Sequence, residues 1–428
     1  MTATPTVFVV DGARTPFLKA RTGPGPFSAS DLAVKSGQAL LKRQSFSPTD
    51  LDEVVLGCIG PSPDEVNIGR VVALRLGCGD KVPGWTVQRN CASGMQAIDS
   101  AARSIITGRA NLVLAGGTEA MSHAPILWRP EMATVLAEWM SAKTLGQRAK
   151  VLASLRPQFL KPVIALLRGL TDPVVGLSMG QTAEILAKKF NITRTQMDEF
   201  AVQSHLRLVA AQSEGRLTEI SPVVDSKGKV HDHDDGVRAD SAVGKLAKLK
   251  PVFDRHFGHV TAGNSAQITD GASWVVLASE QAVKDFDLEP LGRIVDTEWA
   301  GLDPRQMGLG PVHASAPILA RHDLSLGDIQ FWEINEAFAA QVLACLAAFN
   351  DSDYCQSELG LSAALGEVDQ DTLNVDGGAV ALGHPVGTSG ARIVLHLLNV
   401  LRERQAHRGM AAICIGGGQG GAMLLERD

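Results

Sequence analysis

Short apolar runs alternate with amphipathic stretches in the first third of the chain. Runs of aliphatic and β-branched residues at 7–13, 53–59 and 111–117 predict buried strands. Between them, residues 28–43 and 93–107 carry apolar side chains at helical spacing. Continuous apolar strands that alternate with helices are typical of an α/β sheet covered by helices on its faces.

The last third of the chain repeats this order. Residues 292–299 (GRIVDTEW) match the first apolar run, and residues 329–338 (IQFWEINEAF) match the second. The segment MAAICIGGGQGGAM at 410–423 parallels NLVLAGGTEAM at 111–121, because each has an apolar run, a glycine turn and a methionine at a similar offset. We interpret the repeat as an internal duplication, whose period is far longer than that of solenoid repeats.

A different kind of sequence separates the two halves. It opens with residues 128–170, which contain seven Lys or Arg residues and two Glu residues, so their net charge is +5. Apolar residues are interleaved at helical spacing, and Pro157 and Pro162 interrupt the run. This pattern predicts an amphipathic helical hairpin. We expect a lid packed on the domain below it, and the alternative is a lid that also contacts a membrane surface or a partner subunit.

These boundaries predict three parts in a chain of 428 residues, which is too long for one ordinary domain. Residues 1–125 and 260–290 form an N-terminal half, to which the apolar run ASWVVLASE returns. Residues 126–259 form a loop domain that includes the hairpin. Residues 291–428 form the C-terminal half.

Composition narrows the class of protein. A net charge of −6 argues against broad nucleic-acid binding. The six cysteines include no CxxC pair, so we expect neither a disulfide framework nor a zinc site. The cluster HDHDDG at 231–236 is more typical of a solvated turn than of a metal site, and we expect no metal. With no signal-peptide pattern and no apolar run of roughly 20 residues, we expect a cytoplasmic protein with reduced thiols.

Three reactive side chains lie beside glycine-rich turns. Cys91 sits between a predicted strand and a helix, and a helix start lowers the pKa of a thiol; the alternative is a buried structural cysteine. His384 lies in the glycine-rich segment GGAVALGHPVGTSGAR, where it could act as an acid, a base or a hydrogen-bond donor. The alternative is a loop histidine whose hydrogen bonds are satisfied by the backbone. Cys414 precedes GGGQGG, whose N–H groups would suit an oxyanion hole. This turn lacks the GxGxxG spacing of a dinucleotide loop.

Asn335 adds a fourth candidate. It follows a strand-like run, where its amide would hold a water or a substrate oxygen. Beside it, we interpret Glu336 as a helix-start carboxylate.

Together, the segments NCASGMQAI, INEAFA, GGAVALGHPVGTSGAR and CIGGGQGGAM resemble the thiolase family in sequence and order. The resemblance runs from the first strand to the last residues. It implies an α/β, thiolase-like fold, with two duplicated halves that each hold a mixed sheet covered by helices. The halves would form five αβαβα layers, with the helical loop domain on the coenzyme A and substrate side.

The resemblance also implies roles for the candidate residues. Cys91 would carry the acyl group as a thioester, and His384 would activate it and donate to a thioester oxygen in one oxyanion hole. Asn335 would position a water in that hole. Cys414 would move the proton at the α-carbon. The backbone N–H groups of Cys91 and Gly416 would form the second oxyanion hole.

Substrate contacts follow from the same resemblance. They would fall on Met179, Met307, Phe338, Ser265 and Ile268. Coenzyme A would be a substrate, and no cofactor would be bound permanently. Two positions depart from the family pattern: Ala266 stands where a serine often contacts coenzyme A, and Ser178 stands where short-chain thiolases often carry histidine.

The hairpin and an extra segment at 351–371 resemble the β-subunits of fatty-acid oxidation complexes, although those often carry histidine at the position of Asn335. This similarity implies a 3-ketoacyl-CoA thiolase of fatty-acid β-oxidation. It also implies a homodimer or dimer of dimers, a hydratase/dehydrogenase α-subunit as partner, and a location peripheral to the inner membrane through the 128–170 hairpin. The alternative activity is an acetyl-CoA acetyltransferase that makes acetoacetyl-CoA. A ketoacyl synthase is disfavoured by Cys414, and a non-catalytic scaffold by the complete reactive set.

Overall fold

The computed structural model describes residues 5–427, and its centre is a sheet of ten strands. The N-terminal half contributes β1 (Val7–Arg14), β2 (Leu18–Lys19), β3 (Glu53–Gly57), β4 (Gly84–Val87), β5 (Leu112–Ala120) and β10 (Thr269–Ser279). The C-terminal half contributes β11 (Gly292–Gly301), β12 (Phe331–Ile334), β13 (Arg408–Ile415) and β14 (Gln419–Glu426). The strand order is β12-β13-β14-β11-β1-β10-β5-β3-β4, and β2 pairs with β10.

The strand order confirms the predicted duplication. The path β1-β10-β5-β3 is repeated as β11-β14-β13-β12. In both copies the first two pairings are antiparallel and the third is parallel. The halves meet where β1 pairs antiparallel with β11, with Phe8 opposite Arg293 at the centre of the register. Each of these two strands also has a register shift at the same relative place, between Val9 and Asp11 and between Ile294 and Asp296.

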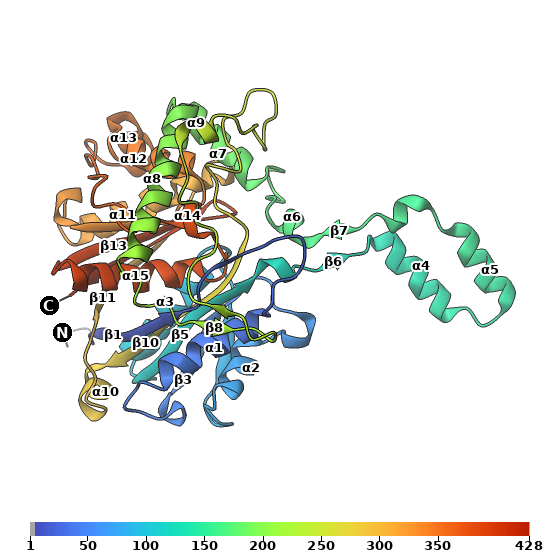
Figure 1. Cartoon of the computed structure of the whole chain (residues 1–428), viewed down its shortest axis with the longest axis horizontal. Coiled ribbons are helices and arrows are strands. Elements are labelled where there is room, and N and C mark those ends of the chain that lie inside the picture. The colour runs from blue at the N-terminus through green and yellow to red at the C-terminus, as the bar shows by residue number, and fades with distance from the viewer. Residues whose placement is uncertain (1–4, 428) are drawn as a thin grey trace.

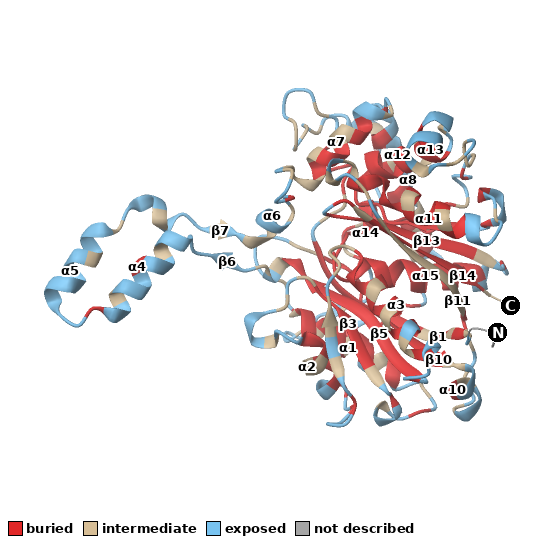
Figure 2. Ribbon diagram, turned by 180° about the vertical axis from the view of Figure 1, so that it is seen from behind, coloured by how far each residue is buried: buried red, intermediate tan, exposed pale blue. Residues whose placement is uncertain are grey.

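Helices cover the sheet in the predicted layers (Figure 1). They are α1 (Ala29–Leu41), α2 (Ile68–Arg75), α3 (Ser93–Ile106), α11 (Gly310–Arg321), α12 (Ala339–Phe349) and α15 (Ser389–Glu403). Helices α3 and α15 lie between the strands of the two halves and share one apolar core with both. The outer helices α1 and α2 pack on the N-terminal strands, and α11 and α12 pack on the C-terminal strands. Figure 2 shows the strands and the middle helices as mostly buried.

The loop domain begins with the two-stranded stalk of β6 (Ile126–Leu127) and β7 (Val163–Ile164). Its other elements are α4 (Pro130–Ser141), α5 (Leu145–Ser154), α6 (Ala165–Gly169), α7 (Met179–Lys189), α8 (Arg194–Ser213), β8 (Val223–Val224), β9 (Val230–His231) and α9 (Val243–Leu246). Helices α10 (Glu280–Asp285), α13 (Ser352–Leu359) and α14 (Ala379–Leu382) complete the fold. In the part of the chain that the structure describes, no helix has the length and apolar character needed to cross a bilayer.

The helical hairpin of α4 and α5 is present as predicted, but the expectation of a lid was wrong. Figure 1 shows both helices projecting from the body on the β6–β7 stalk. Met140 and Leu145 are each 85% exposed. The apolar stripe therefore faces solvent, because the stalk holds the helices away from the domain that a lid would cover.

Two glycines set the distance between the middle helices. A Cβ atom on Gly94 of α3 would lie 2.8 Å from the backbone nitrogen of Ala391, and one on Gly390 of α15 would lie 2.6 Å from that of Met95. Only glycine allows backbones to approach this closely. The contact brings together the starts of α3 and α15, immediately after the loops of Cys91 and His384.

We expect Gly390→Ala to destabilise the protein by roughly 1–3 kcal/mol, because the new methyl group meets backbone that cannot move aside. Gly146→Ala is the matched control, since Gly146 is also the second residue of its helix but has open space around it. Urea denaturation of both variants tests the difference. Equal midpoints for the two variants would contradict the steric argument.

Candidate active site

Cys91 lies in a tight turn between β4 and α3. The preceding residue, Asn90, has a left-handed backbone with φ of 42°. The Ser93 hydroxyl accepts the Arg89 N–H at 2.9 Å and donates to the Asn90 carbonyl at 2.7 Å. The Asn90 side chain donates to the Gly416 carbonyl at 2.7 Å. These bonds hold the partly exposed Cys91 against the glycine turn that follows β13.

The Cys91 thiol is less acidic than its place near a helix start predicted. Burial raises its pKa, and the nearby Glu119 carboxylate acts in the same direction. The backbone N–H groups of Gly416 and of Cys91 itself oppose that shift without cancelling it. The expectation of a lowered pKa was therefore wrong, because desolvation outweighs the helix start. A thiol in this state needs a base to become a nucleophile.

His384 has the features of that base. It is buried in the loop between α14 and α15, and its Nδ1 lies 2.7 Å from the Ser389 hydroxyl. That hydroxyl donates to the Pro385 carbonyl, so it accepts from the Nδ1–H of His384. The other ring nitrogen, Nε2, is then a free acceptor, and it has no partner within residues 5–427. Burial, reinforced by the positive charge of Arg392, lowers the pKa of His384 to about 3, so the ring is neutral at pH 7.

This shift predicts acid sensitivity. The unfolded chain protonates His384 near pH 6.5, while the folded chain keeps the ring neutral down to about 3. Stability therefore falls as the pH drops through this window. We expect His384→Asn to reduce the stability lost between pH 7 and pH 5 by about 2 kcal/mol. Urea midpoints at the two pH values measure this, and the exposed His256→Asn is the control. An equal loss in both variants would contradict the assignment.

Cys414 and Asn335 are the buried candidates that the C-terminal half contributes. Cys414, near the end of β13, is 1% exposed, and burial raises its pKa well above the ordinary value. Cys91 is near enough to raise it further. The Asn335 side chain is fully buried directly after β12, and neither amide atom has a partner among the described residues. A buried amide without partners suits a bound water or substrate oxygen.

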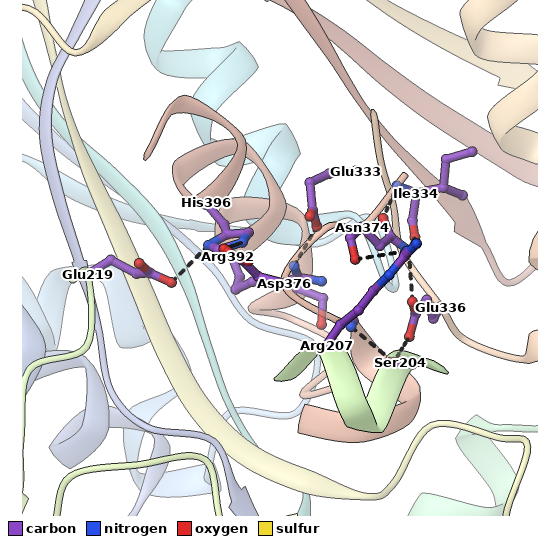
Figure 3. Close-up of polar contacts among 12 residues, drawn as sticks. Ser204, Arg207, Glu219, Glu333, Ile334, Glu336, Asn374, Asp376, Arg392 and His396 are labelled. Carbon is purple, nitrogen blue, oxygen red and sulfur yellow. Dashed lines mark hydrogen bonds and ion pairs between the residues drawn. The ribbon is translucent and has the colours of Figure 1, made fainter. Parts of the chain in front are cut away.

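Glu336 has a different place from the helix start that we predicted. Helix α12 begins only at Ala339, and Glu336 is buried (Figure 3). It accepts hydrogen bonds from the Ser204 hydroxyl at 2.6 Å and from the Asn374 side chain at 2.9 Å. It also accepts the Val380 N–H at 3.1 Å. The carboxylate thus joins the Asn335 loop to α8 and to the segment that leads to His384.

A cavity of about 940 Å³ opens at Cys91. Its walls come from both halves and from the root of the hairpin. Residues from the catalytic turns that line it are Asn90, Cys91, Gly416 and Gly417. Apolar residues from the loop domain and its approach include Met121, Pro125, Ala165, Leu166, Leu170, Val174 and Met179. Cys91 therefore faces a large space with mostly apolar side chains around it.

The predicted substrate residues are distributed around this centre. Met179 begins α7 and lines the cavity, whereas Met307 is buried just before α11. Phe338 packs edge-on against Phe253, with ring centroids 5.8 Å apart.

The predicted coenzyme A contacts lie beside Phe338. Ser265 forms a backbone bridge with Phe338, but its hydroxyl donates to the Thr261 carbonyl at 2.7 Å. Ile268 is 37% exposed and open to a ligand. The roles of Ser265 and Ile268 stay predictions.

Two residues of this site were missed by the sequence analysis. Asn90 fixes the Cys91 turn, and its signal was its position next to the reactive cysteine. Glu119 is 4% exposed yet lines the cavity. The glycine pair before it, which we expected to form a turn, lies inside β5 (Leu112–Ala120), so no local motif marked Glu119.

The cluster at 231–236 forms ordinary polar contacts. Asp234 is buried, and its two oxygens bind the Arg14 guanidinium at 2.7 and 2.9 Å. His231 lies 3.2 Å from Asp225. The acidic and histidine side chains of this cluster therefore contact different partners.

Comparison with known proteins agrees with this architecture. Residues 7–281 match the family model "Thiolase, N-terminal domain", and residues 288–427 match "Thiolase, C-terminal domain". The 3-ketoacyl-CoA thiolase of Pectobacterium atrosepticum is 38% identical over 420 residues, which cover 97% of this chain and 95% of that protein.

Solved structures give the same result. Human mitochondrial 3-ketoacyl-CoA thiolase in complex with CoA is 36% identical, with a TM-score of 0.84 over 99% of this chain and 98% of its own. An acetyl-CoA acetyltransferase from Syntrophomonas wolfei is 32% identical, with a TM-score of 0.86 over 99% of this chain and 100% of its own. The duplicated fold is that of an acyltransferase, and the starts of α3 and α15, next to the Cys91 and His384 loops, pack together between its halves. The chain belongs to the thiolase family.

Proposed function

We propose that this chain is a 3-ketoacyl-CoA thiolase of fatty-acid β-oxidation, which uses coenzyme A to cleave a 3-ketoacyl-CoA into acetyl-CoA and a shortened acyl-CoA. The single observation that carries the proposal is the juxtaposition at Cys91. Its thiol lies near the Gly416 N–H and the Cys414 thiol, and Cys91 lines a large, mostly apolar cavity. Curated relatives that match nearly the whole chain carry this name.

The first half-reaction uses three side chains. His384 Nε2 takes the proton of the Cys91 thiol, and the thiolate attacks the keto carbon of the substrate. The bond between the keto carbon and the α-carbon breaks, and its electron pair stays on the α-carbon of the departing acetyl-CoA enolate. The Cys414 thiol protonates that carbon, and Cys91 keeps the shortened acyl group as a thioester.

The second half-reaction restores the resting state. A coenzyme A thiol gives its proton to the Cys414 thiolate and attacks the thioester carbonyl. Acyl-CoA leaves, and the Cys91 thiolate recovers its proton from the His384 imidazolium. Cys91 regains the proton that it lent to His384, and the proton of coenzyme A replaces the one that Cys414 gave to acetyl-CoA, so the cycle needs no further reactant.

Two oxyanion holes fit the polar groups present. The N–H groups of Gly416 and Cys91 both act on the Cys91 sulfur and would receive the oxygen of the acyl-enzyme. Protonated His384 and a water held by Asn335 would receive the enolate oxygen, since both side chains have buried atoms without protein partners. Each donor of this kind contributes roughly 3–4 kcal/mol to transition-state stabilisation.

Coenzyme A is a substrate in this scheme, and we propose no permanently bound cofactor. We place it on the side of the loop domain, residues 126–259, between the N-terminal half (1–125 and 260–290) and the C-terminal half (291–428). Phe338, Ser265 and Ile268 would contact it. Because Ser265 uses its hydroxyl within its own loop, these contacts would be mainly apolar.

Chain-length dependence tests the activity. The apolar cavity of about 940 Å³ at Cys91 supports a medium or long acyl chain. We expect thiolysis of 3-ketohexadecanoyl-CoA to have a higher kcat/KM than thiolysis of acetoacetyl-CoA. Leu166→Trp, at the root of the hairpin, should narrow the cavity and selectively slow the long substrate. Activity confined to acetoacetyl-CoA would favour the acetyltransferase alternative.

We propose that the projecting hairpin binds an anionic membrane surface, which would make the protein peripheral to the inner membrane. Its exposed apolar residues are interleaved with seven basic and two acidic residues. The wild type should sediment with phosphatidylglycerol vesicles more than with phosphatidylcholine vesicles. Met140→Glu with Leu145→Glu should abolish this binding, whereas Val230→Glu, elsewhere on the surface, should not. Equal binding by all variants would contradict the proposal.

The assembly is proposed from the family resemblance, which also supplies the hydratase/dehydrogenase α-subunit as a partner. Strand β4 ends the sheet, and its Trp85 is 37% exposed, which suits pairing with a second copy. Light scattering should give a particle of twice or four times the chain mass of 45.2 kDa. A monomer at micromolar concentration would contradict this assembly.

A further inference from the structure

Glu119 is a buried carboxylate beside the nucleophile that the reaction scheme leaves unused. It lies near the end of β5, where it lines the cavity and is near enough to raise the pKa of Cys91. One carboxylate oxygen accepts the Ile59 N–H at 2.9 Å. The other accepts the Gly60 N–H at 3.0 Å, with the Cys58 thiol 3.8 Å away. Burial raises the pKa of this carboxyl group to about 7, although the backbone N–H groups and the Cys58 thiol favour its charged form. Among the described residues it pairs with no cation.

The same carboxylate reaches the C-terminal half. The backbone N–H of Gly387 lies near Glu119 and favours the charged form of its carboxyl group. A Cβ atom on Gly387 would lie 2.6 Å from Oε2 of Glu119, and one on Gly117 would lie 2.1 Å from the Gly387 carbonyl oxygen. The end of β5 and the loop after His384 are therefore in direct contact. Gly387 is three residues after His384 and two residues before Ser389. The Ser389 hydroxyl orients the His384 ring.

Glu119 is a point at which the cavity wall meets the His384 loop. Ile59 and Gly60 form that wall, and both line the cavity with Glu119. A hydrophobic side chain at position 119 would leave the backbone N–H groups of Ile59 and Gly60 without their acceptor, which lowers stability. A polar group with satisfied hydrogen bonds makes its surroundings rigid, so Glu119 would fix the position of its partners.

We propose that Glu119 is a positioning residue for the thiolase reaction, whose carboxylate ties the loop of His384 to the cavity wall beside Cys91. This inference rests on the proposed function for its kinetic effect. Because base and nucleophile come from different halves, a link between their loops sets the distance over which the proton moves. An error of about 1 Å in such placement costs about 10²-fold in rate.

The variant Glu119→Gln separates positioning from simple electrostatics. Its amide keeps one acceptor oxygen but turns an N–H toward the backbone donors, so one side of the link is lost. Removing the negative charge would by itself make Cys91 more acidic and speed its alkylation by iodoacetamide. Misplacing His384 would slow that alkylation at pH 7, because the thiol would lose its base. The two effects have opposite signs.

We expect Glu119→Gln to lower kcat by about 10²-fold, with the KM for coenzyme A within roughly twofold of the wild type. Cys91 alkylation at pH 7, followed by peptide mass spectrometry, should be slower than in the wild type. A kcat within roughly twofold, with unchanged or faster alkylation, would overturn the proposal. The exposed Glu289→Gln is the matched control for loss of one charge.

Two further measurements keep the test decisive. If Glu119→Gln does not fold, Glu119→Asp retains the charge but withdraws it from the backbone donors, and the same decrease in kcat and in alkylation rate is expected. Wild-type protein without thiolysis would contradict the proposed function. The alkylation comparison would still decide whether Glu119 positions the base, because iodoacetamide needs no acyl-CoA.

Discussion

Cys91→Ala is expected to lower the rate of thiolysis by about 10⁴-fold or more, because the acyl group then has no atom to which it can be transferred. The wild type, incubated with a 3-ketoacyl-CoA and no free coenzyme A, should gain the mass of the shortened acyl group on the peptide that contains Cys91. The variant should gain none. Its fold should be preserved, since the change removes one sulfur from a partly exposed site.

The control for this result is a second cysteine of the same half. Cys78 is buried on the other face of the N-terminal strands, in the core beneath α1 and α2. Cys78→Ala should retain thiolysis and acyl-enzyme formation. If Cys91→Ala kept more than a tenth of the wild-type rate, the acyl-enzyme mechanism would be refuted, whatever the behaviour of the control.

Arg392→Met should have the largest effect on stability. Arg392, in α15, donates to Glu333 of β12 at 2.6 Å, and both side chains are 2% exposed (Figure 3). Removing the cation leaves the Glu333 carboxylate buried without a partner, which costs roughly 3–5 kcal/mol. The urea midpoint should fall accordingly.

The double variant Arg392→Met with Glu333→Leu is the matched control. It removes both charges, so most of the lost stability should return, because an apolar pair avoids the desolvation cost of the ions. If the double variant were less stable than Arg392→Met alone, the unpaired charge would not be the cause of the loss. The pair also joins α15 to the strand before Asn335, so any residual activity defect reports on that connection.

Local patterns along the chain predicted most of the fold. The apolar run at 7–13 became β1 (Val7–Arg14), and the segment at 28–43 became α1 (Ala29–Leu41), which is capped by Ser28 and Asp31. The loops of the candidate residues Cys91, Asn335, His384 and Cys414 could be singled out because each is a compact motif. The duplication predicted that they come from both halves.

Other features depend on contacts that no local pattern contains. The amphipathic pattern predicted the hairpin helices, but the β6–β7 stalk decides whether their apolar faces meet a domain or solvent. The direction of the Cys91 pKa shift depends on how many groups cover the thiol. Glu119 could not be singled out, because its partners at Ile59 and Gly387 are distant in sequence and use only backbone atoms.

The junction of the halves has a consequence for how the two halves could associate. Aligning β1 with β11 makes Phe8 equivalent to Arg293, and these two residues face each other at the centre of the pairing. Val7 lies opposite Ile294 and Val9 opposite Gly292, so exchanging the halves reproduces the register. Such a self-complementary contact is the kind by which identical subunits form a closed pair. Two separate chains of half this length would meet through the same contact with the same register.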